Sequence, residues 1–251
     1  MADYKIIVDS SCELPAQYKN DERIDLIPFR LEINGVPLRD TEDVNTKTLL
    51  EKIAESKALT SAACPSPDVF YNSIASGSSK RVYIITISSK LSRCYMSAMV
   101  AKKLYEENNS DKEIYVIESG SFSGGESQLA LMAMEMEEQG ITGEDLKKKL
   151  VAYRDQLKTI VFIKDAAEEK IDEAFTCIRE GFNQMADNVA TALKGASEQT
   201  RIIITHCNNL IDAEELKRVL IEKTGLNNIV IMKESAVNSI FTNNGGVVVS
   251  F

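Results

Sequence analysis

The amino-acid sequence predicts an α/β protein made of two α/β domains, the first a mostly parallel sheet covered by helices. Short apolar runs rich in β-branched residues alternate with longer segments of helical spacing. This repeated order is typical of parallel strands joined by crossover helices. With 251 residues, of which 44% are hydrophobic, the chain has enough apolar material for two cores.

The first part of the chain supplies the elements of the first domain. The expected strands are Tyr4–Val8, Leu26–Ile33, Arg81–Ile87 and Glu113–Ile117. The expected helices are Thr46–Lys57, one starting at Pro67, Ser92–Glu107, Glu126–Gln139 and Gly143–Gln156. Asn34-Gly35 predicts a turn. Ser66 as cap and Pro67 at the first helical position favour a helix start.

The second part resembles an α/β unit of its own, so we expect domains at residues 1–158 and 159–251. Its expected strands are Thr159–Ile163, Arg201–Thr205, Asn228–Met232 and Gly246–Phe251. Its expected helices are a long region from Ala166 to Leu193 and a shorter one from Ile211 to Lys223. No Pro-rich or Gly-rich linker separates the two units.

Charge and composition argue against several classes of partner. The net charge of −9 does not fit a nucleic-acid-binding face or attachment to anionic lipid. No apolar run approaches the roughly 20 residues that cross a bilayer, and MADYKIIVDSS enters a strand rather than a signal peptide. We therefore expect a cytoplasmic protein without stable membrane insertion. Five dispersed cysteines and one histidine make a zinc site or a disulfide framework improbable.

The stretch from Ile84 to Ala101 is the most informative part of the chain. It begins as a buried strand, passes through a serine-rich loop and continues as a helix. Ser88, Ser89 and Ser92 lie at this strand-to-helix corner, where open α/β sheets usually bind ligands. Hydroxyls and free helix N–H groups suit an anion such as a carboxylate or a phosphate.

Six segments, taken in order, resemble the DegV family of bacterial fatty-acid-binding proteins. They are IIVDSSCELP (Ile6–Pro15), IPFRLEINGVPLRD (Ile27–Asp40), PSPDVF (Pro65–Phe70), ITISSKLSRCYMSA (Ile85–Ala98), YVIESGSFSGGE (Tyr115–Glu126) and ITHCNNLIDAEELK (Ile204–Lys217). The resemblance implies a long-chain fatty acid in a cleft between two domains. It also implies a carrier without its own cofactor, which presents the carboxylate to an ATP-dependent kinase subunit for phosphorylation to acyl phosphate. The absence of a GxxxxGK[ST] loop agrees with that role.

The resemblance also implies candidate head-group residues. A serine of the SSKLSG-type loop transfers to Ser92, and Ser89 of the same loop is a further candidate. The threonine of a TSQPS-type loop does not transfer directly: without a gap its position falls on Ala62, whereas a small shift places it at Ser61 or Thr60.

This chain departs from the family pattern at several positions. Arg93 replaces the glycine that usually follows the serine, and residues 241–246 (FTNNGG) replace a histidine motif. An LKKGGRI-type segment and the strands after it are missing. We therefore expect a shortened C-terminal half, which puts kinase docking in question.

Two other functions remain open on the sequence alone. A serine hydrolase or acyltransferase would use a serine of the Ser88–Ser92 loop, His206 as base and Asp9 to orient it, although no GxSxG elbow occurs. A binding module for a small phosphorylated ligand would use the same loops.

Overall fold

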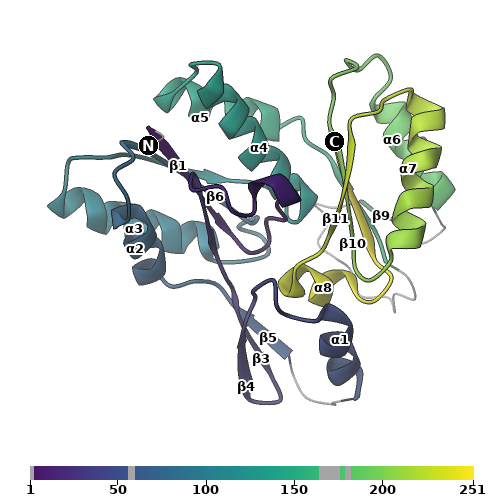
Figure 1. The fold of residues 1–251 in the computed structure, drawn as a ribbon, viewed down its shortest axis with the longest axis horizontal. Coiled ribbons are helices and arrows are strands. Elements are labelled where there is room, and N and C mark those ends of the chain that lie inside the picture. The colour runs from purple at the N-terminus through teal and green to yellow at the C-terminus, as the bar shows by residue number, and fades with distance from the viewer. Residues whose placement is uncertain (1–2, 56–59, 164–175, 179–181) are drawn as a thin grey trace.

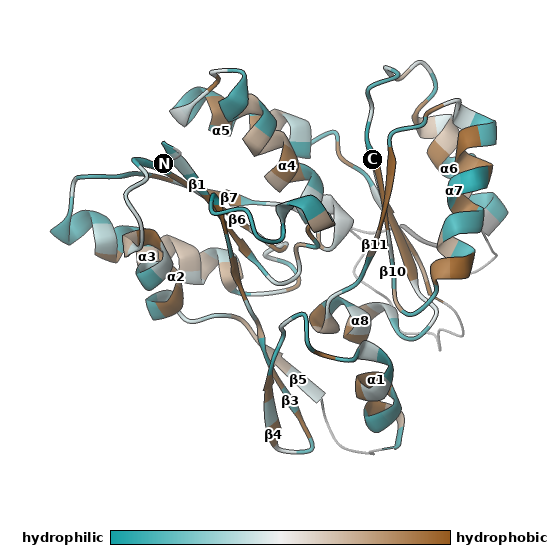
Figure 2. Cartoon of the chain, in the orientation of Figure 1, coloured by the Kyte–Doolittle hydropathy of each residue, from teal (hydrophilic) through white to brown (hydrophobic). Residues whose placement is uncertain are grey.

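The computed structural model describes residues 3–55, 60–163, 176–178 and 182–251 (Figure 1). It confirms the predicted α/β class. The described strands form three sheets of four, five and three strands. In Figure 2 hydrophobic colour concentrates in the strands of the two larger sheets, while the helices carry hydrophilic colour on much of their surface.

The first sheet is wholly parallel, as predicted. Its strands are β2 (Ile24–Ile27), β1 (Tyr4–Asp9), β6 (Arg81–Thr86) and β7 (Glu113–Glu118), in that order. The two central strands, β1 and β6, are almost entirely buried because helices cover both faces.

Helices α2 (Pro67–Ala75) and α3 (Cys94–Asn108) pack on one face of the first sheet and α4 (Gly124–Glu138) and α5 (Gly143–Arg154) on the other, and Figure 1 shows both layers. Side chains of α2 and α3 share a core cluster with Ile7 and Ile84. On the opposite face, α4 and α5 pack on alternate residues of the same strands, Ile6, Val8, Tyr83 and Ile85. Successive side chains of each strand therefore point alternately into the two helical layers. Ser66 precedes α2 as predicted, but its side chain makes no capping hydrogen bond.

The prediction of one strand over Leu26–Ile33 is wrong, because part of this segment belongs to a small antiparallel sheet. The segment divides at Pro28, since β2 ends at Ile27 and β3 (Arg30–Ile33) joins a different sheet. There β3 pairs with β4 (Val36–Arg39) and β5 (Thr60–Ala63). The predicted turn is present: Asn34 and Gly35 have φ of 52° and 77°, as a tight hairpin requires. Helix α1 (Thr46–Glu55) follows this hairpin.

The second large sheet is mixed. Its order is β11 (Ile229–Lys233), β10 (Ile202–His206), β12 (Val247–Ser250), β8 (Thr159–Phe162) and β9 (Thr176–Ile178), with β12 antiparallel to both neighbours. Helices α6 (Phe182–Ala192) and α7 (Leu210–Thr224) lie on one face (Figure 1). Their apolar side chains share one cluster with Ile202, Ile204 and Val249.

The expected helix over Ala166–Leu193 is wrong in part. Residues 176–178 form β9, which pairs in parallel with β8, and the helix starts only at Phe182. The acidic residues of this region are compatible with helical propensity, but pairing with β8 decides the conformation of 176–178. The rest of the expected helix, 164–175 and 179–181, lies outside the described residues.

The two large sheets meet through close packing at the start of α4. A Cβ at Gly124 would lie 2.7 Å from Cγ2 of Ile203 on β10, so only glycine fits there without a shift. Beside it, Ser123 has an unusual φ of 53°. Its backbone N–H donates to Ser11 Oγ at 3.2 Å, and its hydroxyl lies 2.6 Å from Thr205 Oγ1. Contacts from both sheets therefore hold Ser123 in this conformation.

Asp40 and Glu13 are the carboxylates that connect helix α8 (Ala236–Thr242) to the rest of the fold. Asp40 is 2% exposed. Its carboxylate accepts hydrogen bonds from Ser10 Oγ at 2.7 Å and from the backbone N–H groups of Ala236 and Val237 at 2.8 and 3.2 Å. Acceptance from the first turn of a helix is a favourable position for a negative group. One carboxylate thus joins the loop after β1 to α8.

Glu13 makes a second connection to the same helix. Its Oε1 accepts from the Ser235 backbone N–H at 3.0 Å and from Asn238 Nδ2 at 2.5 Å. Asn238 Nδ2 also donates to the Ser11 carbonyl at 2.8 Å. Burial raises the pKa of Glu13 to about 7, so the free energy of this contact depends on pH.

We predict that Asp40→Ala destabilises the fold by about 3 kcal/mol, because it leaves three donors without their acceptor. The measurement is the shift of the urea unfolding midpoint. Asp43→Ala is the matched control, since Asp43 is exposed and lies on the same loop. Equal midpoints for the two variants would refute the assigned role of Asp40.

We predict a second effect from the raised pKa of Glu13. The folded pKa of about 7 exceeds the ordinary value of 4.5, so the folded state holds this proton more tightly. The resulting stabilisation is complete below the unfolded pKa and is lost as the pH rises through the folded pKa. It amounts to at most about 3 kcal/mol.

Urea unfolding at about pH 5 and about pH 8 measures this effect. Glu13→Gln keeps an acceptor but cannot ionise, so we expect a smaller loss of stability between the two pH values than in the wild type. Glu22→Gln, on an exposed side chain, is the control. A Glu13→Gln profile as steep as that of the wild type would show that Glu13 does not titrate as described.

Candidate functional site

The carboxyl ends of the first sheet are organised around the buried side chain of Asp9. Asp9 closes β1, and its two carboxylate oxygens accept from the backbone N–H groups of Ser11 at 3.0 Å and Ile87 at 2.9 Å. Burial raises the pKa of Asp9 to about 6, although both N–H groups oppose the shift. Asp9 therefore fixes the loops that follow the two central strands.

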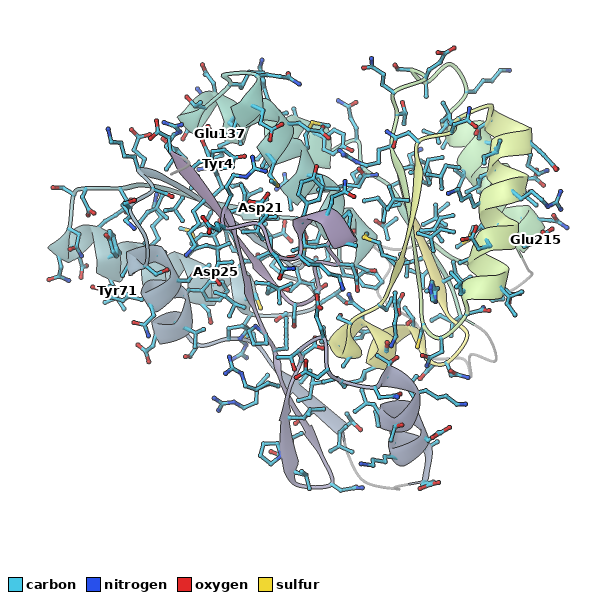
Figure 3. All side chains as sticks on the ribbon, in the orientation of Figure 1. Tyr4, Asp21, Asp25, Tyr71, Glu137 and Glu215 are labelled. Carbon is cyan, nitrogen blue, oxygen red and sulfur yellow. The ribbon has the colours of Figure 1, made fainter. Side chains whose placement is uncertain are left out.

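At their amino ends, the two central strands carry basic side chains that form ion pairs within the protein. Arg81 Nε donates to Glu137 at 2.8 Å, and Lys5 lies 3.0 Å from Asp25. Tyr4, Asp25 and Glu137 are labelled in Figure 3. These charged side chains are thus paired within the protein, whereas the carboxyl ends are where open α/β sheets usually bind ligands.

The three serines after β6 have different surroundings. The buried Ser88 donates its backbone N–H to Ser121 O at 2.7 Å, and its hydroxyl accepts from the Lys90 backbone at 3.3 Å. Ser89 is exposed, and both its N–H and its hydroxyl donate to Glu118 Oε1, at 2.8 and 3.3 Å. A serine already bonded to a carboxylate is a poorer donor to a second carboxylate.

Ser92 lies at the start of α3 in a group of hydroxyls and thiols. Its Oγ accepts from the Cys94 backbone N–H at 3.3 Å and lies 3.5 Å from Cys94 Sγ. Cys64, which follows β5, places its Sγ 3.9 Å from Ser97 Oγ, one turn along α3. We call Ser92, Ser97, Cys64 and Cys94 the α3 corner. Of these, Ser97 escaped the sequence analysis, although it lies three residues after Cys94 and hence on the same helical face.

The pairing of β5 with β3 separates the two candidates for a second hydroxyl. Thr60 pairs with the buried Ile33, whereas Ser61 pairs with the exposed Glu32. Since side chains alternate across a strand, Thr60 faces the core side and Ser61 the solvent side. Thr60 Oγ1 is buried and has no hydrogen-bond partner among the described residues.

Thr60 lies four residues before Cys64, the member of the α3 corner that follows β5. At the usual rise per residue of a strand, that separation along the chain is about 13 Å. Among the described residues, no hydrogen bond joins Thr60 to Ser92. Ala62, on the same face as Thr60, lies nearer to the corner.

Apolar side chains from the small sheet, the second large sheet and α8 converge beside the α3 corner. The cluster includes the corner residues Cys94 and Cys64, the ring of Phe122 at 6.5 Å from that of Phe241, and side chains on β3, β8, β12 and α8. Its members from these four elements are Leu31, Ile33, Val161, Val248, Ala236 and Val237. A hydroxyl group beside an apolar cluster matches a molecule with one polar end and a long apolar part.

His206 lies at the end of β10 in the other large sheet. Its Nδ1 accepts from the Asn209 backbone N–H at 3.1 Å, and burial lowers its pKa. Within the described ranges, no hydrogen bond joins His206 to Asp9 or to a serine of the Ser88–Ser92 loop. The arrangement expected for the hydrolase alternative is therefore not assembled in this conformation.

No group of three or more His, Cys, Asp or Glu residues has the geometry of a metal site in the part of the chain that the structure describes. Among the helices that the structure describes, none combines the length and apolarity needed to cross a membrane.

Comparison with known proteins places the chain among relatives of one family. The family model described as "Uncharacterised protein, DegV family" matches residues 3–168. A DegV domain-containing protein of Streptococcus pyogenes serotype M18 is 29% identical over 160 residues, 62% of this chain and 56% of that protein. One from Streptococcus gordonii is 27% identical over 161 residues, with the same coverage. The matched region thus spans little more than half the length of these relatives.

Solved structures extend the likeness to nearly the whole chain. A DegV family protein of Ruminococcus gnavus, refined with vaccenic acid, has a TM-score of 0.90 and 28% identity over 99% of both chains. A Eubacterium eligens DegV protein loaded with heptadecanoic acid has a TM-score of 0.85 at 17% identity, covering 98% of both chains. For the Streptococcus pneumoniae fatty acid kinase B3 protein loaded with linoleic acid, the values are 0.83 and 22%, over 99% of this chain and 98% of that one.

These comparisons correct one expectation and confirm another. The shortening expected for the C-terminal half is not seen against the Ruminococcus gnavus structure, which this chain matches over 99% of both lengths. The six sequence segments identified the family correctly. Because the family model covers more than half of the residues, this protein belongs to the DegV family.

Proposed function

We propose that this protein binds a long-chain fatty acid between two domains, residues 1–158 and 159–251. We further propose that it presents the carboxylate to a partner kinase, which converts it to an acyl phosphate. The main support is the α3 corner beside an apolar cluster to which the small sheet, the second large sheet and α8 contribute. Fatty acids named with the related Ruminococcus gnavus, Eubacterium eligens and Streptococcus pneumoniae structures agree with this ligand class.

The energetics of such a ligand favour an apolar cluster over a polar pocket. Each buried methylene contributes about 0.8 kcal/mol, so a long acyl chain contributes on the order of 10 kcal/mol before ordering costs. The head group then needs few hydrogen bonds. It needs them in the right place, because an unpaired carboxylate next to an apolar cluster is strongly unfavourable.

Among the candidate head-group residues, the local geometry favours Ser92. It lies just before the first turn of α3, where the backbone N–H groups of the helix start add to the hydroxyl. Thr60 is the better of the two β5 candidates, because its hydroxyl is buried and without a partner among the described residues. Ser61 faces solvent and Ser89 is bonded to Glu118, so we assign both a smaller part.

In this proposal the protein is a carrier rather than the phosphorylating enzyme. The acyl carboxylate is the nucleophile that attacks the γ-phosphate of ATP, and a separate subunit would supply the nucleotide site. No observation in the described residues favours the hydrolase alternative over this role. The exposed Arg93 beside Ser92 is a positive group that a negatively charged partner surface or phosphate would meet.

We predict that denaturing the purified protein releases a C14 to C18 fatty acid in stoichiometric amount. Mass spectrometry of the extracted lipid identifies and counts it. An empty protein that also takes up no oleic acid in solution would overturn the proposed function.

We predict that Ser92→Ala weakens oleic acid binding by about tenfold, the effect of losing one hydrogen bond to a charged group. Titration with oleic acid, followed by calorimetry, measures the change. Ser110→Ala, on an exposed loop, should bind as the wild type does. Wild-type affinity in Ser92→Ala would remove Ser92 from the site without excluding fatty-acid binding elsewhere.

A further inference from the structure

Two cysteines meet at the α3 corner although they are far apart in sequence. Cys64 follows β5 of the small sheet, and Cys94 is the first residue of α3. Both belong to the same apolar cluster, Cys94 as a fully buried member and Cys64 as a partly exposed one. Ser97, one turn after Cys94, lies 3.9 Å from Cys64 Sγ, so the thiol of Cys64 rests against the first turn of the helix.

The Cys94 thiol has a partner on each side. It lowers the pKa of both Cys64 and Asp9, which places it beside each of them. Ser92 Oγ also lies 3.5 Å from Cys94 Sγ. A buried thiol, a second and accessible thiol, and a carboxylate that can take a proton thus form one contiguous group.

The two thiols differ in their ability to ionise. Hydrogen bonds, first from Cys94 and then from Ser97 and Ser92, lower the pKa of Cys64 to about 6, although burial opposes them. Burial instead raises the pKa of Cys94. Because the thiolate is the nucleophile, Cys64 is the sulfur that reacts first near neutral pH. The other two cysteines with described side chains, Cys12 and Cys207, are buried and have raised pKa values.

We propose that Cys64 and Cys94 are a redox-active pair that hydroperoxides convert to a disulfide at the α3 corner. The Cys64 thiolate attacks hydrogen peroxide, forming a sulfenic acid and releasing hydroxide. The Cys94 sulfur then attacks the Cys64 sulfur, and the disulfide forms with loss of one water molecule. The Cys94 proton leaves through the adjacent Asp9 carboxylate or directly to the departing oxygen. Both electrons pass from the two sulfurs to the peroxide.

The disulfide would act on the site proposed for the fatty-acid head group, a consequence that rests on the proposed function. It joins the end of the small sheet covalently to α3, the helix that Ser92 precedes. It also removes the Cys64 thiolate, a negative charge that would repel a carboxylate. Oxidation therefore holds the corner closed around a bound carboxylate, and exchange of the fatty acid with solvent should stop until a thiol reductant opens the disulfide.

The first test is chemical and does not depend on ligand binding. The reduced full-length protein is treated with hydrogen peroxide, alkylated with iodoacetamide, and digested for mass spectrometry. We expect a cross-linked peptide pair containing Cys64 and Cys94, a loss of alkylation at both, and recovery of both with dithiothreitol. Without peroxide, alkylation of Cys64 should rise with pH through a midpoint near the pKa of about 6. Independent alkylation of both cysteines after peroxide treatment would overturn the proposal.

Cysteine-to-serine variants distinguish oxidation of the Cys64–Cys94 pair from general oxidation of the thiols of the protein. Cys64→Ser should abolish the cross-link and leave Cys94 reduced, while Cys94→Ser should leave Cys64 as a sulfenic acid that a dimedone probe traps. Cys207→Ser is the matched control, because Cys207 is buried in the other large sheet region and should leave the cross-link intact. A Cys64 cross-link to any other cysteine would refute the assignment.

The second test measures the effect on the ligand with radiolabelled oleic acid as the probe. In the wild type, we expect exchange of bound for free oleic acid to be lost after peroxide treatment and restored by dithiothreitol. Cys64→Ser should exchange equally before and after peroxide. Failure of the reduced wild type to bind oleic acid would refute the proposed function alone, whereas normal exchange in the cross-linked protein would refute the coupling proposed here.

Discussion

The carboxylate of Asp9 is the constraint on which the site depends. It is buried at the end of β1 and accepts backbone N–H groups from the loops after both β1 and β6. A buried carboxylate is unfavourable unless donors compensate for the lost water, so both loops are held where their N–H groups meet it. The first loop contains Ser11, which bonds to Asn238 of α8 and to Ser123 before α4. The second continues to Ser92 and α3. One side chain thereby sets the position of the segments that surround the candidate site.

The sequence allowed most of the fold to be predicted because its periodic signals are local. Parallel strands such as Arg81–Thr86 are continuous apolar runs, and the helices that cover them have clear spacing. The small sheet and β9 were not predicted, since their conformation depends on partners distant in sequence. Leu26–Ile33 reads as one strand until Pro28 is seen to end β2, and residues 176–178 become a strand only beside β8.

The candidate site was predictable in type and less so in detail. The corner after β6 follows from topology, but the three serines there look alike in the sequence. Only three-dimensional contacts distinguish Ser89, bonded to Glu118, from Ser92 at the start of α3. In the same way, only strand register separates Thr60 from Ser61. The meeting of Cys64 with Cys94 had no sequence signal, because their contact depends on how the small sheet lies against α3.

The polar groups around the site are of two kinds, buried acids and the hydroxyls and thiols of the α3 corner. Buried acids, Asp9 and Glu13 among them, have raised pKa values and accept hydrogen bonds from backbone N–H groups. They connect loops through these hydrogen bonds, and burial makes them easier to protonate than exposed carboxylates. The α3 corner instead places the hydroxyls of Ser92 and Ser97 beside its two thiols, and a hydroxyl can donate to an anion without a compensating cation. In the proposed function, a carboxylate with an apolar chain would bind at moderate cost in desolvation. It would also be able to leave again, because no buried ion pair would have to be broken.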